Sequence, residues 1–177
     1  MRYFIALLGL LNFSFSYQKN NILEIDKNLS VVVTQPNQTS EELLNAVKSS
    51  NNDAIYCAIL RINNQNSPFV VSKYISAVPE TIEHAFERSV NFKPIVSDSK
   101  YKIVKSESYK KEGKYLYCKI SQITFESGKS VHNIMFYVMQ NNKSNNLYEL
   151  KISCKPEETI ANKQCLEKIA LSAIFHN

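Results

Sequence analysis

The residues with the strongest chemistry in this chain are its four cysteines and three histidines. They are Cys57, Cys118, Cys154 and Cys165, and His84, His132 and His176. A structural zinc site usually includes a Cys-x-x-Cys pair or a similarly close set of ligands. No such pair occurs here, and no histidine has ligand spacing to a cysteine. The sequence therefore predicts no metal site.

His84 is the best candidate for acid-base chemistry, because Glu83 and Glu87 are close to it and a nearby carboxylate can hold an imidazole in one tautomer. Helical spacing places these three residues away from the apolar face of their segment, so we expect them to be exposed. His132 begins an expected strand and could face either side of it. We predict no catalytic role for either histidine and keep both as candidates for ligand or partner contact.

Motifs for the common enzyme classes are missing. The chain has three glycines, too few for a phosphate-binding loop, in which glycine lets backbone amides approach the anion. It also contains no Gly-x-Ser-x-Gly elbow and no His-Glu-x-x-His pair. We predict a protein that is not an enzyme and that uses no cofactor.

The N-terminal sequence MRYFIALLGLLNFSFS has the order of a secretory signal peptide. One basic residue, Arg2, precedes an apolar stretch that Asn12 interrupts well before the roughly 20 residues needed to span a bilayer. No cysteine lies near the expected cleavage site after Ser14 or Ser16, so no lipid anchor is predicted. We expect residues 1–16 to be removed and the mature protein to be periplasmic or secreted, without an integral membrane anchor.

Export changes the expected chemistry of the cysteines. In an oxidising compartment four cysteines most simply form two disulfides, for which three connectivities exist. The pattern places Cys154 at the end of a strand and Cys165 in the following helix, so a bond between them would clip that helix to the sheet. We therefore predict the pairs Cys154 with Cys165 and Cys57 with Cys118.

Lysines and tyrosines alternate along residues 100–119, KYKIVKSESYKKEGKYLYCK, which carry seven lysines. Such a stretch could follow an anionic polymer by charge and stacking. The alternation with apolar residues is instead typical of an antiparallel sheet with one buried face, in which the lysines occupy the solvent-exposed face. The net charge is also modest, falling from +5 to about +4 once Arg2 is removed. We predict no nucleic-acid partner.

The elements that would position these residues follow one another without a composition break, so we expect residues 17–177 to form a single α+β domain. Residues 22–36 contain a strand or strand pair, and a helix follows the capping pattern at Thr39 and Ser40. A central strand is predicted over residues 54–63, then a polar loop. A short strand then leads into a helix whose first turn is Pro79, Glu80 and Thr81.

The C-terminal half reads as a four-stranded meander followed by a helix. The expected strands are Tyr101–Ser108, Tyr115–Thr124, Val131–Gln140 and Leu147–Cys154, separated by short polar turns. The expected helix covers residues 156–175 and directs Ile160, Cys165, Ile169 and Ala173 toward the sheet. The predicted fold class is α+β, a largely antiparallel β-sheet with helices packed against it.

This order of elements resembles the PsbP and DcrB group of α-β-α sandwich proteins. The resemblance rests on the helix segment VPETIEHAFERSV, the meander segment YLYCKISQITFESGKSVHNIMFYVMQNNKSNNLYELKISC and the closing segment IALSAIF. It implies a PsbP-like fold and an exported binding role that is mostly non-catalytic. The group has no catalytic motif, so the resemblance implies no functional residue.

Two functions remain open. The first is a non-enzymatic interaction protein that binds a partner protein in the cell envelope, one version being an immunity-type toxin antagonist. The second is a small-ligand carrier or hydrolase with a cleft between the meander and the last helix. Tyr137 and Tyr148 are candidates for ligand or partner contact in either case, although their period-two placement also suits an ordinary core.

Overall fold

The computed structural model describes residues 21–33, 37–38, 41–92, 99–141 and 143–176. The predicted signal peptide of residues 1–16 and the predicted cap residues Thr39 and Ser40 lie outside these ranges. The fold described below therefore concerns the predicted mature chain.

Seven strands form one large sheet. Their order is β3 (Asn37–Gln38), β4 (Ala54–Ile62), β5 (Gln65–Thr81), β9 (Lys143–Cys154), β8 (Ser130–Val138), β7 (Lys114–Phe125) and β6 (Ser99–Lys111). Every neighbouring pair is antiparallel. The predicted meander is confirmed as β6 to β9, and β5 extends the sheet beyond β9.

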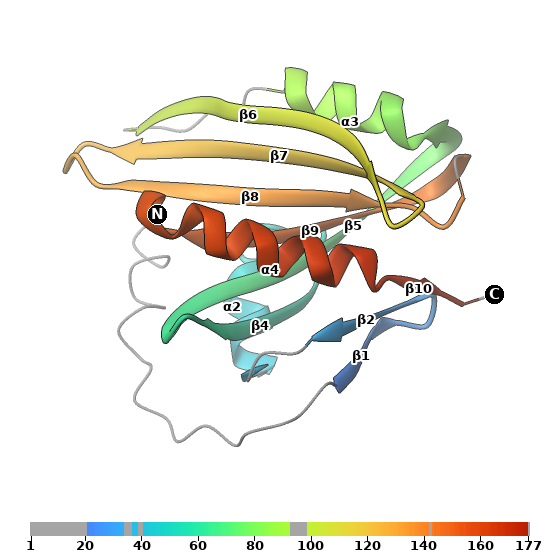
Figure 1. Ribbon diagram of the computed structural model, residues 1–177, viewed down its shortest axis with the longest axis horizontal. Coiled ribbons are helices and arrows are strands. Elements are labelled where there is room, and N and C mark those ends of the chain that lie inside the picture. The colour runs from blue at the N-terminus through green and yellow to red at the C-terminus, as the bar shows by residue number, and fades with distance from the viewer. Residues whose placement is uncertain (1–20, 34–36, 39–40, 93–98, 142, 177) are drawn as a thin grey trace.

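Both faces of the large sheet are covered (Figure 1). One face packs against α4 (Thr159–Leu171) and a small antiparallel sheet of β1 (Asn21–Asp26), β2 (Leu29–Val33) and β10 (Ile174–Phe175). The opposite face packs against α2 (Glu41–Lys48) and α3 (Ile82–Asn91). The predicted α+β class with a largely antiparallel sheet is therefore confirmed, as is the sandwich architecture.

The two coverings explain where the core residues lie. Successive residues of a strand point to opposite faces, so Ile134 and Phe136 pack under α4 while Met135 and Tyr137 pack under α3. All four are buried. A strand covered on both sides buries both of its alternating sets, as β8 does here.

Two predicted boundaries are wrong. Pro79–Thr81 belongs to the end of β5, and α3 begins at Ile82 with Thr81 as its N-cap, whose Oγ1 accepts a hydrogen bond from the His84 amide at 3.3 Å. The predicted loop after β4 is a tight turn, because Asn63 and Asn64 adopt the left-handed region with φ of 49° and 62°. Asparagine tolerates that region better than most residues, so β5 can begin at Gln65.

The last helix is shorter than predicted. A 3-10 turn, η1 (Pro156–Glu158), precedes α4, and the chain leaves α4 to form β10 beside β2. Cys165 and Ile169 are buried as predicted, but Ile160 is 74 % exposed and Ala173 lies beyond the helix. None of the helices within the described ranges combines the length and apolar character needed to cross a membrane.

Candidate binding cavity at the hairpin end

Five separate segments meet at one end of the sandwich. They are the end of β5, the start of α3, the β6–β7 turn, the residues after β8, and the segment that joins α4 to β10 (Figure 1). We call this region the hairpin end. An open cavity of about 350 Å³ lies here, between the meander and the end of the last helix.

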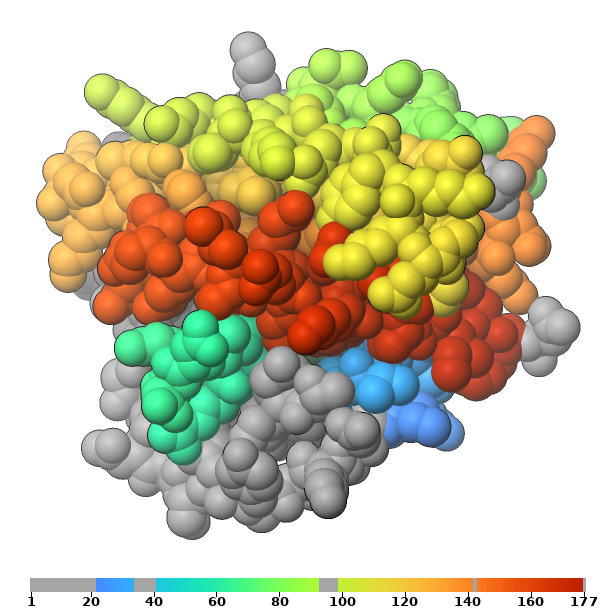
Figure 2. Space-filling model, viewed as in Figure 1, coloured from blue at the N-terminus to red at the C-terminus, as the bar shows by residue number. Residues whose placement is uncertain are grey.

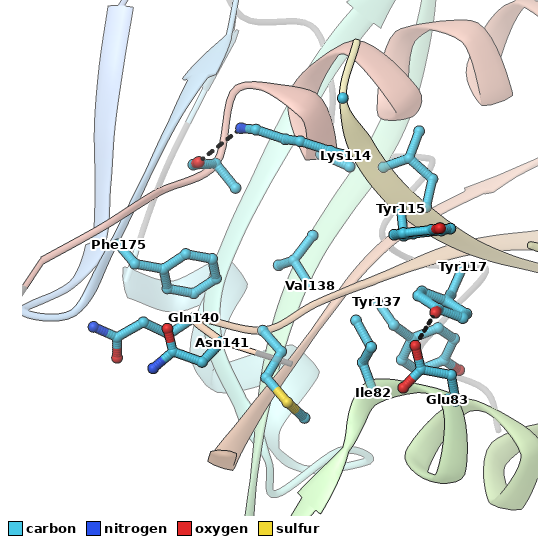
Figure 3. Close-up of a pocket in the computed structure, with 15 residues that line it drawn as sticks. Ile82, Glu83, Lys114, Tyr115, Tyr117, Tyr137, Val138, Gln140, Asn141 and Phe175 are labelled. Carbon is cyan, nitrogen blue, oxygen red and sulfur yellow. Dashed lines mark hydrogen bonds between the residues drawn. The ribbon is translucent and has the colours of Figure 1, made fainter. Parts of the chain in front are cut away.

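Aromatic side chains form much of the cavity wall. Figure 3 shows Tyr115, Tyr117 and Tyr137 on one side of the cavity and Phe175 on the other, with Val138 between them. Tyr115 is 64 % exposed, whereas Tyr117 and Tyr137 are buried against α3. The cavity therefore has a fixed aromatic floor and one aromatic ring at its mouth.

The polar groups of this floor are held by hydrogen bonds. The Tyr117 hydroxyl donates to the Glu83 carboxylate, and the Tyr137 hydroxyl donates to Glu149 Oε2 at 2.8 Å while accepting from Ser89 Oγ at 2.9 Å. Burial, followed by the hydrogen bond to Glu83, raises the pKa of Tyr117, and burial also raises the pKa of Tyr137. The hydrogen bond from Tyr117 lowers the pKa of Glu83. Both tyrosines thus stay protonated at neutral pH.

Lys114 closes the cavity on the side of α4. Its Nζ donates to the Leu171 carbonyl oxygen at 2.6 Å and lies 3.4 Å from the Ala173 carbonyl oxygen. Leu171 is the last residue of α4, where backbone acceptors lack helical partners and a cation is favourable, and Ala173 follows just beyond the helix. Lys114 therefore ties the β6–β7 turn to the last helix.

His84 lies in a second hollow of the hairpin end, next to the cavity. Its Nδ1 is 3.5 Å from Glu80 Oε2, and its side chain is 70 % exposed. Arg88 holds the same carboxylate with two bonds of 2.7 Å. The predicted exposure of His84 is confirmed, but the carboxylate that contacts it is that of Glu80, four residues earlier at the end of β5, and not that of Glu83 or Glu87.

His132 lies away from the cavity, on the face of the sheet that α4 covers. It is buried, with Nδ1 2.7 Å from Thr159 Oγ1 and Nε2 3.2 Å from Gln122 Oε1. Burial, and then the charge of Lys102, lower its pKa. These contacts join strands β7 and β8 to the start of α4. Throughout the described part of the chain, no three His, Cys, Asp or Glu side chains gather as a metal site would require.

The two candidate tyrosines are core residues, the alternative that their period-two placement left open. Tyr148 is buried under the small sheet, with its hydroxyl 3.0 Å from Asp26 Oδ2 and its ring packed near Phe175. Tyr137 is equally buried and reaches the cavity only as part of its floor. Both are buried because β8 and β9, on which they lie, are covered on both faces.

The predicted disulfides are not formed, and all four cysteines are buried free thiols. Cys57 on β4 and Cys118 on β7 are four strands apart, or about 19 Å at the usual strand spacing, far beyond disulfide reach. Cys154 lies beside Thr159, which hydrogen-bonds it, and Cys165 is about 9 Å further along α4. The helix is already held to the sheet by apolar packing.

The sequence analysis missed the apolar rim of the hairpin end. The pairing of β5 with β9 is interrupted between Ile75 and Glu80, and the residues between them stand out from the ladder. Ile75 and Val78 are 74 % and 69 % exposed. The signal was present in the sequence ISAVP, a mostly apolar run that ends in proline three residues before α3 begins and breaks the strand alternation.

No protein-family model matches the sequence, and no match is found among curated proteins. Solved structures do match. The solution structure of the cyanobacterial PsbP (CyanoP) of Synechocystis sp. PCC 6803 has a TM-score of 0.56 at 10 % identity, covering 93 % of this chain and 96 % of its own.

Two further structures are similar at 10 % identity. The Ran-binding protein Mog1p of Saccharomyces cerevisiae has a TM-score of 0.49, and the match covers 91 % of this chain and 96 % of Mog1p. LpqN of Mycobacterium tuberculosis, involved in cell envelope biogenesis, has a TM-score of 0.47, and the match covers 90 % of this chain and 91 % of LpqN. The predicted resemblance is thus confirmed at the level of architecture: this chain has a PsbP-like fold.

Proposed function

We propose that this protein is an exported, non-enzymatic interaction protein that binds a partner protein of the cell envelope through the hairpin end. Residues 1–16 would direct export, and residues 17–177 would form the mature binding domain. An immunity-type antagonist that neutralises a toxin is one form of this function.

The observation that carries the proposal is the set of exposed apolar side chains around an open cavity. Tyr115, Val78 and Ile75 are each more than half exposed: Tyr115 lines the cavity with the aromatic floor, Val78 lines the second hollow, and Ile75 lies on the same strand as Val78. Contiguous exposed apolar surface with a polar rim is typical of protein interfaces, and tyrosine is enriched in their centres. A partner that inserts a side chain into the cavity would remove this surface from water.

The state of the polar groups supports binding over catalysis. Lys114 is bonded to backbone carbonyls and Glu83 to Tyr117, so both have structural partners. The pKa values of Tyr117 and Glu83 are shifted away from neutrality in opposite directions. A general acid or base works best with a pKa near the working pH. These residues are better suited to shaping the cavity than to moving protons.

The experiment is affinity purification of the tagged, exported protein from its native cell envelope, with mass spectrometry of co-eluting proteins. We expect one dominant partner that co-elutes at near-equal amounts. The double change Val78→Ser with Tyr115→Ser should reduce the recovery of that partner at least about 10-fold, because hot-spot side chains contribute about 2 kcal/mol or more to binding. The matched control is Ile160→Ser, an equally exposed apolar residue ten positions, or about 15 Å, along α4 from Ala170 at the cavity. Equal recovery with the double variant would reject the hairpin end as the binding surface.

The cavity itself favours a second candidate function, a small-ligand carrier. It lies between the meander and the last helix and, at about 350 Å³, has the volume of a small-molecule site. Native mass spectrometry of the purified protein separates the two. A small molecule that is retained by the wild type and lost in Tyr115→Ser, without a protein partner, would replace the interaction proposal.

Two further measurements address the finer parts of the proposal. N-terminal sequencing of the mature protein should begin after residue 14 or 16 if export removes the signal peptide. A toxin that is neutralised by one equivalent of this protein would identify the immunity-type version, whereas a non-toxic partner would exclude it.

A further inference from the structure

Strand β6 ends the large sheet with an open edge. Its 13 residues pair with β7 on one side, and no other strand in the described ranges pairs with its outer side. In an antiparallel strand, every second residue directs its N–H and C=O away from the paired neighbour. Figure 2 shows the yellow residues of this edge at the surface of the molecule, beside α4. The edge therefore offers a row of backbone donors and acceptors.

Lysines accompany this edge along its length. Lys105 and Lys111 pair with Glu107 and Glu167, but Lys100, Lys102 and Lys110 are exposed and have no carboxylate at ion-pair distance among the described residues. Lysine on an edge strand commonly prevents unwanted pairing, because a second strand must bring its own charges close to it. The lysines therefore select what can pair rather than excluding all pairing.

Self-pairing is the first occupant that this charge pattern disfavours. Two copies of β6 aligned antiparallel about their midpoint would bring Lys100 of each copy near Lys110 of the other. Like charges placed opposite each other destabilise a strand pair. A strand with carboxylates at those positions would instead gain from each contact.

Nucleic acid is disfavoured for a different reason. Single-strand binding combines cations with exposed aromatic rings on which bases stack. The tyrosines of β6 turn inward, since Tyr101 hydrogen-bonds Ser121 and Tyr109 donates to Glu167 and packs against the core. The edge thus keeps the charges and the backbone groups but not the stacking surface.

We propose that the outer edge of β6 accepts an extended, acidic segment of another protein, which adds to the sheet as an eighth strand. Lys100 and Lys102 lie on the same face and about 7 Å apart, so the segment should carry acidic residues at alternate positions. This surface is separate from the hairpin end, and either proposal can fail without the other.

The test uses the full mature protein and a synthetic nine-residue peptide that alternates glutamate with valine. We expect hydrogen exchange to slow at alternate amides of β6 when the peptide binds. The double change Lys100→Glu with Lys102→Glu should weaken peptide binding about 10-fold. It removes two exposed ion pairs, each worth up to about 1 kcal/mol, and replaces them with repulsion between like charges. The control Lys27→Glu with Lys48→Glu has the same change in net charge at exposed sites on the β1–β2 turn and α2 and should bind as the wild type.

Three probes distinguish strand addition from charge attraction alone. A peptide with lysine in place of glutamate should not bind, and neither should the acidic peptide after N-methylation of every second amide. If the N-methylated peptide binds as well as the parent, or if exchange slows elsewhere and not at β6, the proposal is wrong. Displacement of the peptide by a twenty-nucleotide oligothymidine that leaves β6 amides unprotected would equally overturn it in favour of a polyanion site. The exchange measurement on the wild type does not depend on whether any variant folds.

Discussion

At the scale of single residues, the four cysteines behave as small apolar core residues. Burial raises the pKa of Cys57 and of Cys165 to about 11, and that of Cys118 and of Cys154 to about 12. The thiolate is the reactive form, so a buried thiol with a raised pKa reacts slowly. Burial therefore protects these thiols even in an oxidising compartment.

We predict that the native protein reacts with a thiol-labelling reagent at pH 8 at least about 100-fold more slowly than the unfolded protein, because each pKa unit reduces the thiolate fraction about tenfold and burial limits access. Intact mass after labelling in denaturant without reductant should show four labels, one for each free cysteine. Two labels or none would show that disulfides form and would contradict this structure.

His132 gives a pH dependence whose sign is fixed by its lowered pKa. Well above the ordinary value of 6.5, neither the folded nor the unfolded chain binds a proton at this site, and its contribution to stability is complete. As the pH falls below 6.5, the unfolded chain is protonated first, so the free energy of unfolding decreases until the lower folded pKa is reached. We expect His132→Gln to flatten the curve of unfolding free energy, measured in urea, between pH 7.5 and pH 5.5. The exposed His84, changed to glutamine, serves as the control, and an unchanged slope in His132→Gln would reject this assignment.

The sequence predicted single residues best where helical spacing decides their environment. It gave His84 as exposed and Cys165 and Ile169 as buried, in agreement with the structure. It left Tyr137 and Tyr148 open between contact and core, because alternation along a strand separates two faces without telling whether each face is covered. Both faces of β8 and β9 are covered, so the usual contrast between solvent-exposed and buried positions along these strands disappears.

At the scale of elements, α3 depends on one aromatic anchor. The ring of Phe86 packs 5.5 Å from that of Tyr117 and 5.7 Å from that of Tyr137, between centroids. We predict that Phe86→Ala lowers the free energy of unfolding by about 3 to 5 kcal/mol, the usual cost of emptying a buried phenylalanine site. Phe92, 65 % exposed just beyond the same helix, is the matched control and should change stability by less than about 0.5 kcal/mol when replaced by alanine.

Urea unfolding of both variants provides this measurement. Because the first turn of α3 lines the cavity through Ile82 and Glu83, Phe86→Ala should also weaken any partner that binds the hairpin end. Equal stability losses in Phe86→Ala and Phe92→Ala would show that α3 is not anchored by its buried ring.

Local patterns predicted the meander because each of its turns joins adjacent antiparallel strands, which needs only a few residues of turn signal. They did not predict the length of β5. Its second half pairs with β9, a strand about 70 residues later, and that pairing extends the strand through a break that ends in proline. A contact so distant in sequence leaves little trace in the local pattern.

At the scale of the whole molecule, the candidate cavity shows the same limit. Its lining comes from the start of α3, the β6–β7 turn, the end of β8 and the end of α4, and these segments meet only after the sheet has formed. The second of the two functions left open by the sequence requires a cleft between the meander and the last helix, and a cavity lies there. Of the two tyrosines singled out, Tyr137 lines the cavity floor and Tyr148 does not, whereas the exposed residues Val78 and Tyr115 were not identified.

A polar cluster beside the apolar core joins the small sheet to the large sheet. Asp26, at the end of β1, lies 2.7 Å from Lys73 Nζ of β5 and accepts the Tyr148 hydroxyl of β9 at 3.0 Å. Its other oxygen accepts the backbone amides of Asn28 and Leu29 at 2.9 and 3.0 Å, which shapes the β1–β2 turn. One carboxylate therefore both forms the turn and fixes it to two central strands.

We predict that Asp26→Ala lowers the free energy of unfolding by about 1 to 3 kcal/mol, because it leaves the Lys73 ammonium and the Tyr148 hydroxyl without their acceptor. The small sheet should lose stability before the rest of the molecule does. Hydrogen exchange should accelerate in β1, β2 and β10 while β7, which pairs with neither β5 nor β9, keeps its protection. Asp53→Ala, which removes an exposed carboxylate, is the control. Uniform acceleration across both sheets would mean that they unfold as one unit and that apolar packing under α4, rather than Asp26, sets the stability of the small sheet.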